Sequence, residues 1–173
     1  MPIILLIVSS LAFWALYWFV QMGGIEHFQQ RKKQREDDAK RVAAKEASRT
    51  APLRAIDDPR DAAAVLMLLI ARQNGDPTRE QIALIEDKLR SVFGFERELA
   101  ERMTQARFIA RQAIDFEQAA GVFATLFKKE LTADERCQLI DMLDEVARLE
   151  KPSEGQIDAI AAFRPKIGLA AAA

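Results

Sequence analysis

Two patterns of apolar residues divide the chain: an unbroken run at the N-terminus and a helical periodicity from residue 58 onward. No Asp, Glu, Lys or Arg occurs from Met1 to Ile25, where residues 2–22 read PIILLIVSSLAFWALYWFVQM. As a helix this run spans about 30 Å, the thickness of the hydrocarbon core of a bilayer. The pattern therefore predicts a transmembrane anchor within residues 1–25.

The residues at the end of this run predict its orientation. The aromatic side chains expected to anchor it at the membrane interface are Trp14, Tyr17 and Trp18. The basic residues expected to set the topology and to contact lipid headgroups are Arg31, Lys32, Lys33 and Arg35. Positive charge stays on the cytoplasmic side, which predicts a single-pass protein of the inner (cytoplasmic) membrane with its C-terminal part in the cytoplasm. A cleaved signal peptide is disfavoured, because no Lys or Arg precedes the run and bulky residues end it.

Residues 26–57 carry many charges and few apolar positions. From Glu26 to Asp61 there are ten Lys or Arg and eight Asp or Glu. The many helix-forming residues predict a solvated helical stalk. Because proline disfavours helix at the residue before it, we expect the helix to break at residues 49–52, followed by a hinge over residues 52–58.

From residue 58 onward, apolar residues recur three and four positions apart, as in amphipathic helices. Three capping boxes predict helix starts: Thr78 with Gln81, Thr132 with Glu135, and Ser153 with Gln156. The predicted helices span 61–73, 79–93, 95–114, 115–131 and 135–149, with a last one between Ser153 and Gly168. Helix 61–73 is so apolar that we expect it at the centre. The pattern predicts an all-α domain over residues 58–169, a compact bundle of about six helices, followed by an alanine tail at 170–173.

The two ends of this domain resemble each other. The repeated residues are Ile70-Ala71-Arg72, Pro77-Thr78 and Gln81-Ile82 in the first copy, and Val146-Ala147-Arg148, Pro152-Ser153 and Gln156-Ile157 in the second. The offset is 76 residues before the loop and 75 after it, so the second loop is one residue shorter. This repeat predicts two helical hairpins that flank a middle pair of helices in a pseudo-twofold bundle.

The segment ARQNGDPTREQIALIEDKLRSVFGF resembles the first hairpin of the TerB-like domains, a family that includes tellurite-resistance proteins and the N-terminal region of DjlA co-chaperones. The resemblance covers roughly residues 58–169, and a leading membrane helix is similar to the DjlA arrangement. Asn74 stands where the family usually has Asp, and no glycine precedes Ser153 in the second hairpin. The resemblance implies a helical interaction module in envelope-stress or chaperone-related assembly, and acidic surface sites for divalent cations.

Composition excludes several kinds of chemistry. The chain has one histidine, His27, and one cysteine, Cys137, so no scheme with two imidazoles and no CxxC zinc site can form. Cys137 lies in a helical pattern without a histidine to activate it, and we expect it to be a small packing residue. No phosphate-binding glycine loop or nucleophile elbow occurs. The net charge is −1 for the chain and −3 from residue 62 onward, which disfavours nucleic-acid binding.

Three functions stay open after these exclusions. The first is a membrane-anchored interaction module, not an enzyme, with an unidentified protein partner; a homo-oligomer is also open. The second is a regulatory domain that binds Ca²⁺ or Mg²⁺, since hard cations need several converging oxygen ligands. The candidate metal ligands are Asp76, Glu80, Asp141, Asp144 and Glu145. No other cofactor is expected, and an unrecognised carboxylate enzyme site is the third and weakest alternative.

Overall fold

The computed structural model describes residues 47–48, 50–112 and 115–170. The chain divides into two units, Met1–Glu46 and Ala47–Ala173, and the described residues all belong to the second. The predicted anchor at residues 1–25, with its aromatic and basic flanks, and the stalk up to residue 46 lie outside the described residues, as do residues 171–173 of the alanine tail. Among the helices that are described, none has the length and hydropathy to cross a membrane.

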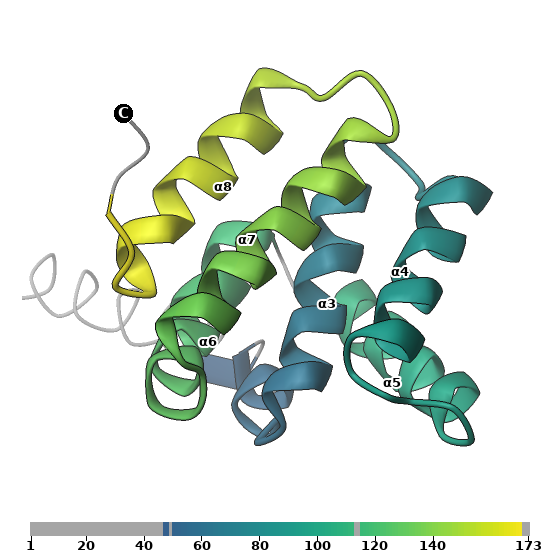
Figure 1. Ribbon diagram of the computed structural model, residues 1–173, viewed down its shortest axis with the longest axis horizontal. Coiled ribbons are helices and arrows are strands. Elements are labelled where there is room, and N and C mark those ends of the chain that lie inside the picture. Colours follow the sequence, from purple (N-terminus) through teal and green to yellow (C-terminus); the bar gives the residue numbers. More distant parts are fainter. Residues whose placement is uncertain (1–46, 49, 113–114, 171–173) are drawn as a thin grey trace, which may run out of the picture. The chain divides into compact units, whose positions relative to one another are not determined.

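The described part of the chain is all-α, as the periodicity predicts, and contains no strand (Figure 1). After residue 58 it has the six helices expected: α3 (Pro59–Arg72), α4 (Arg79–Ser91), α5 (Leu99–Gln112), α6 (Phe116–Glu130), α7 (Ala133–Arg148) and α8 (Glu154–Lys166). A short helical segment at residues 50–54 precedes them.

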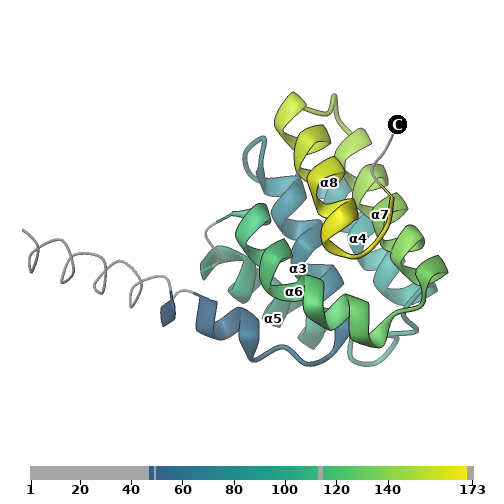
Figure 2. The same cartoon turned by 90° about the vertical axis from the view of Figure 1, so that its left-hand side faces the viewer.

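Helix α3 is the centre of the bundle, as its composition predicts. All of its residues from Ala62 to Ala71 are buried, and it packs against α4, α5, α6 and α7 (Figures 1 and 2). A helix that is apolar on every side needs neighbours on every side, since exposed apolar surface carries a free-energy cost of about 25 cal/mol per Å². This requirement fixes the arrangement of the other helices around α3.

The second part of the core is a group of phenylalanine rings between α6 and α8. Phe163 on α8 makes edge-to-face contacts with two rings on α6, with ring centres 5.8 Å from Phe116 and 6.1 Å from Phe127. Phe123 lies one turn before Phe127 on the same face, with ring centres 6.2 Å apart. All four rings are almost fully buried, so they join α8 to α6 as α3 joins the remaining helices.

Local sequence signals place most of the helix ends. The three predicted capping boxes are present, each with the Ser or Thr side chain bound to the backbone N–H of the third helical residue. Helix α5 begins at Leu99, later than the expected residue 95. Gly94 has a φ of +71°, which turns the chain after α4, and Phe95 then lies buried outside the helix.

Two expectations are wrong. Residues 50–54 are helical, Pro52 included, so the predicted break does not occur at residues 50–52; residue 49 lies outside the described residues. Leu53 and Thr50 are both buried, so this segment packs with the folded unit. Cys137 is exposed on α7, because the buried face of that helix begins at Leu139 and Ile140 and does not include the position before them.

The two hairpins predicted from the repeat, α3–α4 and α7–α8, are joined by equivalent hydrogen bonds. Gln81 Nε2 at the start of α4 donates to Val146 O near the end of α7, at 3.3 Å. Gln156 Nε2 at the start of α8 donates to Ile70 O near the end of α3, at 2.8 Å. Each glutamine thus reaches the first helix of the opposite hairpin at a repeated position.

Both glutamines also keep their local capping role. The side-chain oxygen of Gln81 accepts from Thr78 N at 3.1 Å, and that of Gln156 accepts from Ser153 N at 3.0 Å. The two side chains are buried, 2% and 0% exposed, so their polar atoms need these protein partners. A glutamate could cap a helix equally well but could not donate to the opposite carbonyl. In the third box, where no such bond is made, the residue is the exposed Glu135.

Candidate functional site: an arginine-lined cleft

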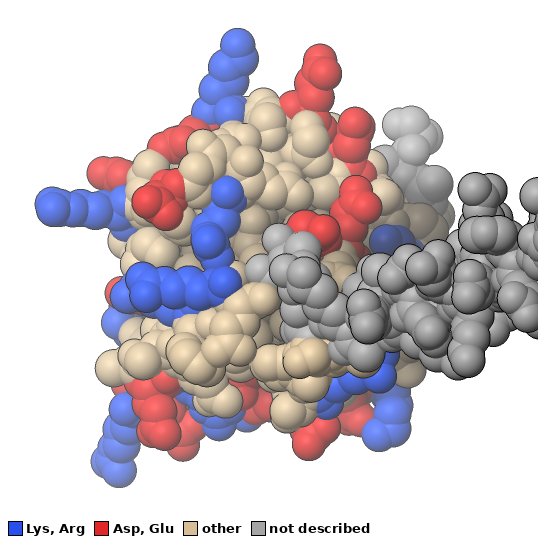
Figure 3. Space-filling view, turned by 180° about the vertical axis from the view of Figure 1, so that it is seen from behind, with Lys and Arg blue, Asp and Glu red and all other residues tan. Residues whose placement is uncertain are grey.

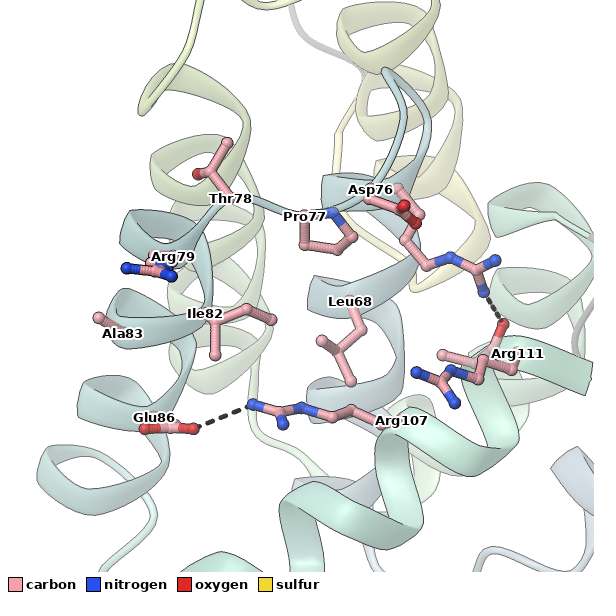
Figure 4. Close-up of a pocket in the computed structure, with 12 residues that line it drawn as sticks. Leu68, Asp76, Pro77, Thr78, Arg79, Ile82, Ala83, Glu86, Arg107 and Arg111 are labelled. Carbon is pink, nitrogen blue, oxygen red and sulfur yellow. Dashed lines mark hydrogen bonds and ion pairs between the residues drawn. The ribbon is translucent and has the colours of Figure 1, made fainter.

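A cleft of about 540 Å³ lies between α3, α4 and α5, beside the loop that joins the first hairpin (Figure 4). It is lined by Leu68, Arg72, Asp76, Pro77, Thr78, Arg79, Ile82, Ala83, Glu86, Arg107, Ala110 and Arg111. The cleft therefore depends on the first hairpin together with α5, whose buried face packs onto α3.

The lining combines an aliphatic surface with a charged margin. Leu68 on α3 and Ile82 on α4 lie at the middle of the cleft, with Pro77 above them in the view of Figure 4. Arginine side chains surround this surface from three helices, and Figure 3 shows Lys and Arg gathered on the side of the molecule where α4 and α5 lie. No aromatic ring lines the cleft.

Two of the four arginines hold the walls together. Arg72 Nη1 on α3 donates to Ala110 O near the end of α5, at 2.6 Å, where the carbonyls of a helix end lack helical partners. Arg107 on α5 forms an ion pair with Glu86 on α4, at 3.1 Å (Figure 4). These contacts fix the positions of α4 and α5 relative to α3.

The other two arginines of the lining, Arg79 and Arg111, have no acceptor in the part of the chain that the structure describes. Arg79, at the first position of α4, and Arg111, in the last turn of α5, make no hydrogen bond or ion pair with any other residue that the structure describes. Both are exposed and line the cleft from different walls. Of the two acidic residues in the lining, Glu86 is already paired with Arg107, which leaves Asp76 in the loop. The cleft thus carries an excess of positive charge at a place where a ligand can reach it.

The predicted metal ligands do not come together. Glu145 on α7 forms an ion pair with Lys88 on α4, and Asp144 lies 3.9 Å from Arg148. Within residues 47–170, gaps excepted, no three Asp, Glu, His or Cys side chains are grouped as a metal ion would need. Asp76 lines the arginine cleft, while Glu80 and Asp141 are exposed.

A second cluster of charges surrounds the start of α3. Asp58 caps the helix and accepts from Arg60, while Arg102 on α5 bonds to Asp58 and Asp61. Both guanidinium groups lie over the Phe95 ring, 4.5 and 4.8 Å from its centre. Such cation–π contacts and charge-assisted bonds tie the start of α3 to α5. The cluster is internally paired and has a structural role.

The pKa values of two carboxyl groups in this cluster, those of Asp58 and Asp61, shift in opposite directions. Partial burial acts to raise the pKa of Asp58, but the hydrogen bonds and charge of Arg60 outweigh burial, and the pKa lies below its ordinary value. For Asp61 burial is the larger influence and raises the pKa despite the charge of Arg102. The backbone hydrogen bond from Thr132 also lowers the pKa of Glu135 at the start of α7.

Sequence reasoning missed the cleft because its charged residues come from three different helices, and their convergence depends on how these helices pack. One sequence signal could have indicated the cleft. Arg107 and Arg111 are four residues apart and share one face of a helix. That face is next to the buried Ala110, so it borders the core. The contribution of Arg79 from α4 depends on how α4 packs, which no local pattern reveals.

No protein-family model matches this chain, and no curated protein or solved structure shows significant similarity to it.

Proposed function

We propose that this protein is a membrane-anchored interaction module whose helical domain binds a protein partner at the cytoplasmic face of the inner membrane. The arginine-lined cleft carries the proposal, since Arg79 and Arg111 have no acceptor among the described residues and border an aliphatic surface. A few convergent charged groups around an apolar hollow are typical of binding sites. The uncharged run at residues 1–25 and the basic residues after it support the anchor and its orientation.

We also propose that the domain is TerB-like and acts in envelope-stress or chaperone-related assembly. The resemblance of the first hairpin and the repeated capped hairpins support this assignment. The departure at Asn74 has a local reason in this chain, because Asn74 Nδ2 donates to the side-chain oxygen of Gln156 at 2.8 Å. An aspartate at this position could not donate that bond.

Site-directed photo-crosslinking from native membranes tests the binding proposal. A photoreactive residue placed at Ala83, which is exposed in the cleft, should give a crosslink to a distinct protein. The matched control is Asp158, the repeat-equivalent exposed position on α8, which should give none to that protein. Equal labelling from both positions, or none from Ala83, would contradict binding at the cleft. A crosslink from Ala83 to a second copy of the chain would show a homo-oligomer instead.

The anchor and its orientation are tested by reporter fusions. Alkaline phosphatase fused after Leu169 should be inactive, and a fluorescent protein fused there should be bright and remain with the membrane fraction. Removal of residues 1–22 should release the fusion into the soluble fraction. An active phosphatase fusion would reverse the topology, and retention of the truncated fusion would contradict the anchor.

A further inference from the structure

We propose that the arginine-lined cleft recognises an acidic peptide segment in which carboxylate side chains flank an aliphatic one. This inference rests on the proposed function and names the chemistry of the partner. It assigns Arg79 and Arg111 as the anion-binding residues, and the half-buried Ile82 and Pro77, above the buried Leu68, as the contact for the aliphatic side chain.

The charge of the cleft identifies the ligand as an anion. Guanidinium groups bind carboxylates through two parallel N–H···O bonds, and such charge-assisted bonds are among the strongest in proteins. Among the described residues Arg79 and Arg111 have no protein acceptor for these donors, whereas Arg72 and Arg107 each use one nitrogen, on Ala110 O and on Glu86. The available pair comes from different walls, α4 and α5, so a bound chain would bridge them.

The aliphatic surface distinguishes a peptide from a free anion. Inorganic phosphate or a lipid headgroup gains nothing from contact with Ile82 and Pro77, while a Leu or Ile side chain is stabilised by each CH₂ that it buries there. A nucleotide base needs an aromatic or planar partner to stack on, and the lining has no aromatic ring. The cleft is therefore complementary to alternating acidic and aliphatic side chains.

The second hairpin offers an internal control for this specificity. The equivalent groove between α7 and α8 is lined by Asp144, Ala147, Arg148, Pro152, Ile157, Ile160, Ala161 and Arg164. It keeps the proline and the isoleucine, but Arg148 has Asp144 beside it, at 3.9 Å. No wall like α5 is part of this groove, so a second pair of arginines is missing.

Peptide binding to the full chain in nanodiscs of neutral lipid tests the proposal. The probe is a fluorescent peptide in which Asp and Glu flank Leu residues, and binding is followed by anisotropy. We expect Arg79→Gln combined with Arg111→Gln to weaken binding about tenfold or more, since two charge-assisted contacts are lost. Arg148→Gln is the matched control in the second hairpin and should leave the affinity unchanged. Binding should also weaken as salt increases.

Three related ligands separate the alternatives. A peptide with Asn and Gln in place of the acids should bind at least about tenfold more weakly. A peptide with Ser in place of Leu should also bind more weakly, and inorganic phosphate should compete poorly. If the Ser peptide or phosphate binds as tightly as the original, the site is a plain anion site and the proposal is overturned. Preferential binding of the chain to vesicles containing anionic lipid, abolished by the Arg79 and Arg111 changes, would overturn it in favour of a headgroup.

The outcome of this experiment is separable from that of the crosslinking. No peptide binding together with a protein crosslinked from Ala83 would remove the acidic-aliphatic specificity but keep the interaction module. Peptide binding that the double arginine variant leaves unchanged would overturn the assignment of Arg79 and Arg111. Circular dichroism of each variant should match the original chain, because both side chains are exposed and make no contact that holds the fold.

Discussion

The two hairpins of this domain share a framework and differ in what surrounds it. In both, a capping glutamine at the start of the second helix donates to a carbonyl of the opposite hairpin. In the first hairpin, α5 packs beside the loop and closes a cleft of about 540 Å³, while the equivalent groove of the second has about 230 Å³ and no such wall. The exposed Ile157 of the second groove corresponds to Ile82, which is half-buried in the first.

The presence of α5 beside only one hairpin distinguishes residues that both hairpins use to hold the fold from residues that line the cleft of the first hairpin alone. A glutamine occurs in both hairpins, and each donates a hydrogen bond to the first helix of the other hairpin. The two bonds therefore form a pseudo-symmetric pair that joins the hairpins. The arginines of α5 occur once and face only the first hairpin. The repeated glutamine bonds thus belong to the framework that both hairpins share, while the α5 arginines belong to the cleft proposed above as the binding site.

The largest effect on stability is expected at the two cross-hairpin hydrogen bonds of Gln81 and Gln156. Gln156→Glu should lower the free energy of unfolding by about 3 kcal/mol, because a buried carboxylate cannot donate to Ile70 O and must give up its hydration. Gln81→Glu should cost somewhat less, since its bond to Val146 O is longer. Urea unfolding of the full chain in detergent, followed by circular dichroism, measures both.

Glu135→Gln is the matched control, because it changes the same position of a capping box that faces solvent. It should change the free energy of unfolding far less than Gln156→Glu or Gln81→Glu. If the exposed and buried boxes respond alike, the cross-hairpin bonds contribute nothing to stability.

A smaller effect should distinguish the two loops. Asn74→Asp removes the donor that Asn74 presents to Gln156 and should cost about 1–2 kcal/mol, because one hydrogen bond is lost and a carboxylate oxygen then faces the Gln156 oxygen, which still accepts from Ser153 N. Glu150 occupies the equivalent place in the second hairpin and is exposed. Glu150→Gln should therefore leave the unfolding free energy unchanged, and a similar loss from both changes would show that the loops are equivalent after all.

The smallest effect concerns the starts of α3 and α7 in acid. A pKa lowered in the folded protein contributes stability that is present above the unfolded value, about 4, and is lost as the pH falls through the folded value. The pKa values of Asp58 and Glu135 are lowered, so these two groups contribute stability that is lost in acid. The pKa of Asp61 is raised, so this group has the opposite effect.

Asp58→Asn should cost about 1 kcal/mol at pH 7, since asparagine still caps α3 but cannot pair with Arg60 or Arg102. It should also reduce the decline of stability below pH 4. The check is the unfolding free energy measured between pH 7 and pH 3 for the original chain and the variant. An unchanged acid profile would show that Asp58 does not control the acid sensitivity of α3.

Local signals predicted much of the fold because the physics behind them is local. Capping boxes at Thr78, Thr132 and Ser153 mark helix starts whatever the helices pack against. The central place of α3 also follows from its composition, since only a surrounded helix can be apolar on all sides. The exposed Cys137 shows the limit, because one position at the edge of an apolar stripe can face either way.

The candidate site was not predictable in the same way. The sequence directed attention to acidic residues, yet the cleft is made by arginines of α4 and α5 that meet only when both helices pack on α3. The sequence indicates the second role of Gln81 and Gln156 only in part, because both repeated capping boxes have Gln where the third has Glu. Their partners lie 65 and 86 residues away in the chain.

The central position of α3 has a consequence for how the domain is made. Its apolar surface is covered by α4, α5, α6 and α7, and its end is bonded by Gln156 of α8. During synthesis, the apolar side chains of Ala62 to Ala71 emerge long before these last partners leave the ribosome. Contacts distant in sequence form slowly, and incomplete domains expose surfaces that aggregate. The nascent chain therefore has a period in which α3 is unprotected, and truncation within α7 or α8 should leave it a client of chaperones.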